Sequence, residues 1–130
     1  MTFDYMAIWN NRDILIDGVL TTLLVSTIAI PIGICIGIAI CMMRISENRL
    51  LRWSAIGYIE VIRNIPFLIL IFLVFYALPF YGMRISGLAT GFICLSIYGG
   101  AYFAEIFRGG IQSVATGQFD ASKALGLKYS

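Results

Sequence analysis

Three long stretches without a charged side chain constrain this chain more than any other feature. They cover residues 18–43, 64–83 and 85–104. Each can cross a membrane, because about 20 helical residues span a bilayer core of about 30 Å. The chain is also 60% apolar and only 12% charged, whereas a soluble domain carries about 25% charged residues. We therefore predict an all-α integral membrane protein with spans at about 18–43, 54–80 and 85–107.

The first stretch does not have the features of a cleaved secretory signal. It is too long and starts too late, and Asp4, Asp13 and Asp17 precede it. A signal peptide needs positive charge at that place. We expect a helix that is retained in the mature protein.

The residue types of the chain argue against metal and histidine chemistry. It contains no histidine, and Cys35, Cys41 and Cys94 all lie inside the apolar stretches. Cysteine there commonly behaves as a small hydrophobic residue, and the spacing predicts neither a disulfide framework nor a metal site. The net charge is only +2 and no basic stripe occurs. We expect no catalytic residues, no metal and no nucleic-acid partner.

Basic residues are unevenly shared between the segments that flank the spans. One alternating set of segments holds six of them: Arg44, Arg49, Arg52, Arg108, Lys123 and Lys128. The other set holds Arg12 and Arg84. The positive-inside rule then predicts a cytoplasmic location for residues 44–52 and for the tail from Arg108, with the N-terminus outside.

Small residues recur at four-residue spacing within the first and third spans. The pairs are Gly33 with Gly37 and Gly87 with Gly91, and a further row comprises Ser96, Gly100 and Ala104. Helices in lipid associate through close backbone approach at small residues. These faces predict a packed bundle, without indicating its function.

Two prolines interrupt the apolar stretches. Pro31 predicts a kink in the first span. Pro66 removes a backbone donor, and the amides of Phe67 and Leu68 just after it could open a half-helix whose positive end faces an anionic solute. A simple proline kink is the alternative.

Two pairs of opposite charges lie at the ends of spans. Glu60 and Arg63 are three residues apart, as are Glu105 and Arg108, so each pair shares a helix face. They are either interfacial charges that reach water or parts of a polar pathway through the bundle. The sequence does not fix their depth.

The tail after the third span is too polar to cross a membrane. Within the segment 111–127, residues 118–125 predict a short amphipathic helix, and Gly126 is placed to end it in a left-handed cap. Such a helix either enters a groove of a partner or packs on its own membrane domain.

Several of these motifs resemble those of ABC importer permeases. Asp120-Ala121-Ser122, followed after three residues by Gly126, resembles the "EAA" loop, which reads Glu-Ala-Ala, three residues, then Gly. The runs at 101–114, 117–118 and 124–127 resemble the polar amino-acid branch (histidine, glutamine or arginine type). Residues 63–68 are similar to that branch's Arg-Gly-Thr-Pro-Leu stretch, and residues 18–23 are typical of it.

The resemblance implies a cytoplasmic-membrane permease domain, usually of five spans, that carries an amino acid. Two such subunits would pair with two ATP-binding subunits, and an extracytoplasmic binding protein would deliver the solute. The chain itself would be no enzyme and hold no cofactor, since it has no phosphate-binding loop of its own. The segment 118–126 would be the coupling helix. The coupling residues implied are Gly117, Phe119, Asp120, Ala121, Ser122, Ala124, Leu125 and Gly126. Candidates for the solute pathway are Arg63, Asn64, Pro66, Phe67, Tyr98, Glu105 and Arg108.

The sequence departs from the family pattern at several positions. Asp120 and Ser122 replace the usual Glu and second Ala, and Asn64 with Ile65 replaces Gly-Thr, which puts the solute class in question. The chain ends four residues after Gly126, before the Ile-x-Leu-Pro part and the last two spans. We expect a fragment or a truncated product. The alternatives are a permease for another small polar solute and a non-transporting scaffold or remnant; an intramembrane enzyme is the weakest.

Overall fold

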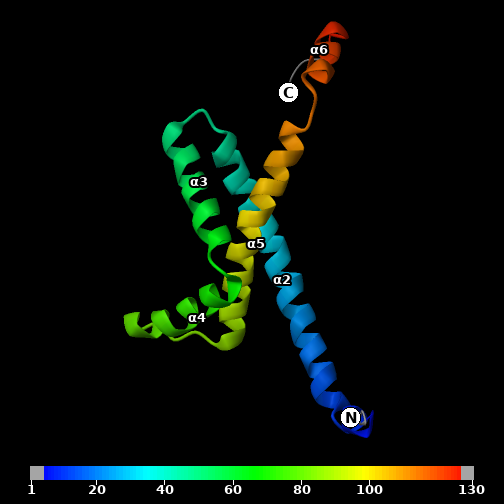
Figure 1. The fold of residues 1–130 in the computed structure, drawn as a ribbon, viewed down its shortest axis with the longest axis vertical. Helices are drawn as coiled ribbons and strands as arrows, with labels where there is room; N and C mark the ends of the chain where they lie inside the picture. Colours follow the sequence, from blue (N-terminus) through cyan, green and yellow to red (C-terminus); the bar gives the residue numbers. More distant parts are fainter. Residues whose placement is uncertain (1–4, 127–130) are drawn as a thin grey trace.

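The computed structural model describes residues 5–126, except for the side chains of Tyr5, Ala7, Thr116 and Phe119. Within residues 5–126 the fold is entirely helical, as predicted, and contains no strand (Figure 1). Its elements are α1 (Tyr5–Asn10), α2 (Arg12–Ile45), α3 (Arg49–Asn64), α4 (Phe67–Ala77), the 3₁₀ turn η1 (Leu78–Tyr81), α5 (Gly87–Gln112) and α6 (Thr116–Ala124).

In the part of the chain that the structure describes, two helices are long and apolar enough to cross a membrane by themselves, α2 and α5. α2 has 34 residues, and at 1.5 Å per residue it is roughly 51 Å long, well beyond a hydrocarbon core of about 30 Å. The helix continues through Pro31. The apolar stretches at 18–43 and 85–104 lie almost wholly within these two helices.

The stretch predicted as a span at 54–80 forms two helices instead of one. α3 and α4 meet at a break of a few residues and are bent by 101°. The cause is local: Pro66 has no N–H to donate, and the residue before a proline is pushed out of the helical region. Ile65 indeed has extended backbone angles (φ −86°, ψ 126°). Only the bent pair together is long and apolar enough for a third span.

The main packing surface joins α2 to α5, which cross each other in Figure 1. Ser96, Gly100 and Ala104, which we call the small-residue face, are buried as predicted. Gly33 and Gly37 of α2 lie against this part of α5. A Cβ added at Gly37 would lie 2.5 Å from Cβ of Phe103 and 3.1 Å from the backbone nitrogen of Ala104.

α5 is also the helix on which α3 and α4 pack. The Tyr58 hydroxyl of α3 donates to the Ile97 carbonyl at 2.6 Å. The Cys94 thiol lies 3.9 Å from the Leu70 carbonyl of α4. The second predicted glycine pair takes no part in this packing, because a Cβ at Gly87 or Gly91 would meet nothing within 4 Å.

Candidate functional site

The break between α3 and α4 presents the first group of predicted pathway residues. α4 begins at Phe67 with Pro66 as its N-cap, so the predicted half-helix is present. The Pro66 carbonyl accepts hydrogen bonds from the amides one turn later, from Ile69 at 2.9 Å and from Leu70 at 3.2 Å. The first amides of a helix have no partner within the helix. The positive end of α4 therefore lies at the break.

An arginine of α3 and an aromatic ring of α4, one on each side of the break, meet two tyrosine rings of α5. The Arg63 guanidinium lies 5.1 Å from the centre of the Tyr102 ring. The Phe67 ring lies 5.0 Å from Tyr98, and Tyr98 lies 5.0 Å from Tyr102. The two tyrosine hydroxyls are 3.1 Å apart. The structure thus brings Arg63, Phe67 and Tyr98 together, and it adds Tyr102.

The sequence analysis did not select Tyr102, although a signal was available. Tyr102 follows Tyr98 by four residues, and Glu105 follows Tyr102 by three. This spacing places all three on one face of a helix. We call Tyr98, Tyr102 and Glu105 the polar stripe of α5.

The predicted ion pair between Glu105 and Arg108 is present. The Arg108 Nη2 atom lies 2.8 Å from Oε2 of Glu105, and Nε lies 3.0 Å from Oε1. Arg44 of α2 also approaches the same carboxylate, at 3.7 Å. Arg108 further donates to Gln112, at the end of α5. A single carboxylate therefore links the ends of α2 and α5, which the sequence alone did not reveal.

The second predicted pair, Glu60 with Arg63, is not an ion pair in residues 5–126. Glu60 instead accepts a hydrogen bond from the Asn64 side chain, at 3.2 Å. Asn64 also donates to the Glu60 carbonyl, at 2.7 Å. The Arg63 guanidinium lies over the Tyr102 ring instead. Asn64 caps its own helix end, since its amide bonds stay within α3.

The tail forms the predicted short helix, and it stands apart from the bundle. α6 packs on none of the other helices within residues 5–126, so these residues do not support the alternative of a helix packed on its own membrane domain. Gly126 has φ +73°, the left-handed geometry predicted for the cap. The described side chains of the predicted coupling residues are exposed, apart from half-buried Ser122. The Phe119 side chain and residue 127 lie outside the described part.

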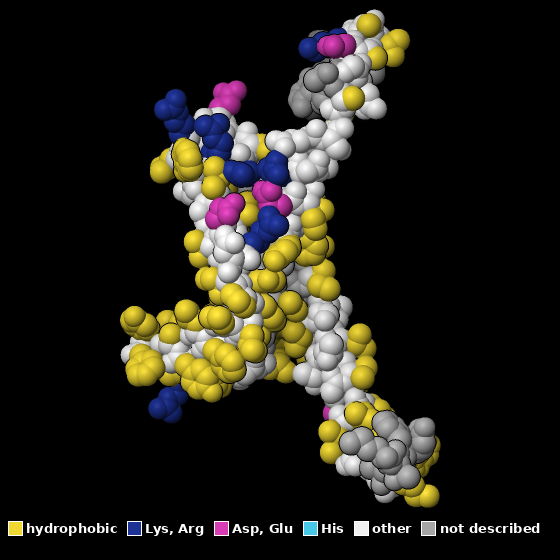
Figure 2. Space-filling view, viewed as in Figure 1, with side chains coloured by type: hydrophobic (Ala, Val, Ile, Leu, Met, Phe, Trp, Pro, Cys, Tyr) yellow, Lys and Arg dark blue, Asp and Glu magenta, His cyan; other side chains and the backbone are white. Residues whose placement is uncertain are grey.

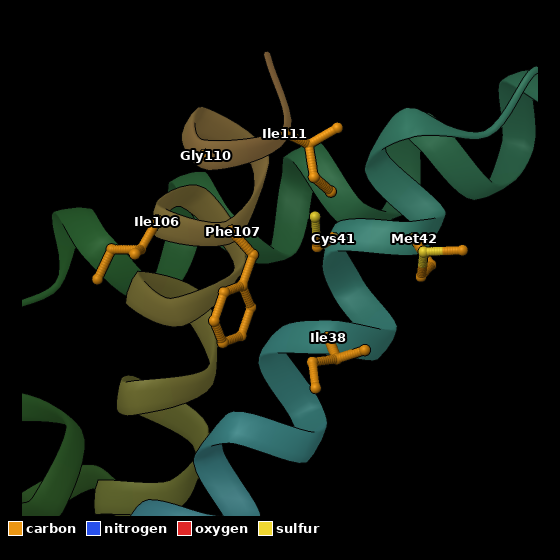
Figure 3. A pocket seen from close by; sticks show the side chains of 7 residues that line it. All are labelled: Ile38, Cys41, Met42, Ile106, Phe107, Gly110 and Ile111. Carbon is orange, nitrogen blue, oxygen red and sulfur yellow. The ribbon is translucent and has the colours of Figure 1, made fainter. Parts of the chain in front are cut away.

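An apolar groove lies elsewhere, between α2 and α5 (Figure 3). It has a volume of about 550 Å³. Its lining consists of Ile38, Cys41, Met42, Ile106, Phe107, Gly110 and Ile111. Figure 3 shows Cys41 of α2 and Phe107 of α5 on its two sides. None of these side chains offers a charge to a polar solute, so the groove is not the predicted pathway.

Comparison with known proteins decides the family. Residues 29–130 match the family described as the inner membrane component of binding-protein-dependent transport systems. The chain belongs to this family. Members of the family are inner-membrane permease components, so the predicted resemblance to ABC importer permeases is confirmed.

The relatives of this family member include named amino-acid permeases. The chain is 40% identical to the probable glutamine ABC transporter permease protein GlnM of Bacillus subtilis (strain 168), over 95% of this chain and 57% of the relative. It is 34% identical to the glutamate/aspartate import permease protein GltK of Escherichia coli O157:H7, over 98% of this chain and 60% of the relative.

The fold also matches a solved transporter of this kind. It superposes on the crystal structure of an amino acid ABC transporter with histidines with a TM-score of 0.91, at 36% sequence identity. The match covers 99% of this chain and 60% of that chain. The family member described here thus spans between half and two thirds of the length of the relatives it matches.

Proposed function

We propose that this chain is part of the membrane-spanning permease subunit of an ATP-driven uptake system for amino acids. Relatives at 34–40% identity are named for glutamine and for glutamate and aspartate, which supports this solute class. The observation that carries the proposal is α6, a polar helix that stands beyond the end of α5 without a packing partner in residues 5–126. A helix of this kind is suited to a groove on another protein.

α6 is the coupling helix in this proposal. ATP is bound and hydrolysed by an ATP-binding subunit, and α6 sits in a groove of that subunit. Only the short connection at residues 113–115 separates α6 from α5, so a movement of α6 reaches the packed bundle through α5. Arg108 supports this connection, because it joins Glu105 to Gln112 at the last turn of α5. A second permease subunit and an extracytoplasmic amino-acid-binding protein complete the assembly.

The break between α3 and α4 is the proposed solute pathway. An amino acid carries a carboxylate, which suits the Arg63 guanidinium and the positive end of α4 that begins at Phe67. The solute's ammonium group suits the aromatic faces of Tyr98 and Tyr102. Non-helical backbone is tolerated at membrane depth where it lines a cavity, which gives the Pro66 break a reason in a transporter.

The orientation follows from the distribution of charge. In Figure 2, Lys and Arg side chains gather at the end of the molecule where α2 turns into α3, close to the end of α5. Basic residues flank membrane spans mainly on the cytoplasmic side. We therefore assign this end, and α6 beyond it, to the cytoplasm, with the N-terminus outside.

The substitution Gly126→Asp tests the coupling role. A residue other than glycine at φ +73° costs about 1 kcal/mol or more, and a negative charge at a helix C-terminus adds about 0.3–1 kcal/mol. If the summed cost of about 1.4 kcal/mol weakens the contact of α6 with the ATP-binding subunit, uptake of labelled amino acid becomes about tenfold slower. The measurement uses the complete transporter in membrane vesicles, with the amount of permease in the membrane quantified in parallel.

Gly126→Asn is the matched control. Asparagine adopts the left-handed region about as readily as aspartate but carries no charge, so its uptake is expected to lie between the original rate and that of the Asp variant. An Asp variant that is inserted normally and takes up solute at the original rate would show that α6 is not the coupling helix.

A further inference from the structure

The first turns of α3 carry exposed residues that the packing of the bundle does not use. Arg49, Leu50, Arg52 and Trp53 are all exposed, with Leu50 at 75% and Trp53 at 66% of their full accessibility. Neither arginine forms an ion pair with any residue in 5–126. We call these four residues the α3 basic face. Two unpaired arginines beside an exposed tryptophan set this end of α3 apart from the purely apolar exposed surface of the bundle.

The α3 basic face lies at the start of the helix, where residues 49–54 are exposed. Arg49, Arg52 and Trp53 are at positions i, i+3 and i+4, so they lie on one side of the helix. The first buried residue of α3, Ala55, follows them, so the exposed residues belong to the part of the helix before its packed portion. The helix start is itself fixed, since the Asn48 side chain accepts from the Leu50 amide at 2.9 Å. The face is therefore a fixed surface and not a frayed end.

The electrostatics of the connection leave this face positive. The neighbouring Arg44 is already engaged by Glu105. Glu47 is the acidic residue of the α2–α3 connection, so two unpaired arginines stand against one carboxylate. The positive end of the α3 dipole lies at the same place. Figure 2 shows basic side chains here directly above apolar ones. Arginine beside tryptophan at the end of an apolar bundle is typical of the headgroup level of a bilayer.

We propose that the α3 basic face binds the headgroup of an anionic phospholipid. The guanidinium groups of Arg49 and Arg52 hold the phosphate, because arginine matches phosphate oxygens in a bidentate manner. The Trp53 ring lies at the level of the headgroup and glycerol. The lipid thereby fixes the depth at which α2 turns into α3.

The test uses Trp53 as a reporter of its neighbouring lipid. The chain has two tryptophans, so Trp9→Phe leaves Trp53 alone. This variant is reconstituted in phosphatidylcholine that contains brominated phosphatidylglycerol or, at the same mole fraction, brominated phosphatidylcholine, with bromines near the glycerol end of the acyl chains. A net charge of about one favours the anionic lipid about fivefold. We expect brominated phosphatidylglycerol to quench Trp53 more strongly than brominated phosphatidylcholine. The ratio of the two apparent lipid affinities should be about five.

Substitutions on the face itself separate lipid binding from membrane insertion. Arg49→Gln with Arg52→Gln is expected to bring the ratio to about one. Arg49→Lys with Arg52→Lys keeps the charge and retains most of the preference. Both double variants are compared for helix content by circular dichroism. A preference that survives the glutamine substitutions would overturn the assignment to this face.

The opposite end of the chain supplies the matched control. In the Trp53→Phe variant, Trp9 reports instead; it lies 5.3 Å from Arg12, whose charge is paired with Asp13 at 3.6 Å. The ratio there is expected to be about one. Equal preference at both tryptophans would mean general enrichment of anionic lipid, and no preference at Trp53 would assign the face to another partner. Either result would overturn the proposal.

Discussion

The close contact of α2 with α5 can be tested by adding a single methyl group. In Gly37→Ala, the new Cβ would lie 2.5 Å from Cβ of Phe103 and 3.2 Å from its carbonyl carbon. These atoms belong to the backbone or are directly attached to it, so no change of rotamer can relieve the overlap. α2 and α5 must move apart, and the contacts along the small-residue face weaken with them.

The magnitude follows from comparison with a glycine in open space. Overpacking of a core typically costs about 1–3 kcal/mol. Alanine also favours the helix over glycine by up to about 1 kcal/mol, and this gain applies equally in Gly91→Ala, where the new Cβ meets nothing within 4 Å. The propensity gain cancels in the difference. Gly37→Ala is therefore expected to be less stable than Gly91→Ala by about 1–3 kcal/mol.

The assay is equilibrium unfolding by titration of SDS into mild detergent micelles, followed by circular dichroism. Gly33→Ala serves as a second control within the same helix contact. Its Cβ would lie 3.4–3.5 Å from its neighbours, which is an ordinary contact distance. It is expected to unfold together with Gly91→Ala. If Gly37→Ala were as stable as Gly91→Ala, the close approach of the two helices at Gly37 would be refuted.

Four other substitutions test the remaining contacts. Tyr58→Phe removes the hydrogen bond to the Ile97 carbonyl and should lower the free energy of unfolding in the same SDS titration by about 0.5–1.5 kcal/mol; an unchanged midpoint would rule out that bond. Glu105→Gln leaves its two arginine partners without a carboxylate and should cost about 1.5–3 kcal/mol, whereas no loss would show that the pairing is not stabilising. Arg63→Ala and Pro66→Ala should slow amino-acid uptake more than they reduce the amount of assembled transporter; normal uptake in either variant would remove that residue from the pathway.

Local patterns predicted much of this structure. The charge-free stretches predicted the two long helices, and four-residue spacing predicted the burial of Gly33 and Gly37. The pair Glu105–Arg108 is a contact within a single helix turn, so its partners could be recognised by their separation alone. Gly126 could be recognised as a cap because glycine is favoured where φ is positive. Each of these features depends on residues close together in the chain.

Contacts between helices could not be predicted in the same way. Arg44 lies 61 positions before Glu105, and their pairing depends on how α2 crosses α5. The predicted partner of Glu60 was also wrong, because the Tyr102 ring on α5 competes for Arg63. The 101° bend likewise exceeds what Pro66 dictates. A proline breaks the helix, but the packing of α4 on α5 sets its direction.

The arrangement of α5 lets one helix take part both in packing and in the proposed solute pathway. Each tyrosine of the polar stripe follows a residue of the small-residue face by two positions, which places it about 200° around the helix at 100° per residue. The first face is used by α2, whereas the tyrosines of the second meet the rings and the arginine at the α3–α4 break. Substitutions on the two faces should therefore separate: those on the small-residue face lower stability, and those of the stripe's tyrosines slow uptake. If substitutions on one face lowered both the stability and the uptake rate, this division of α5 would be contradicted.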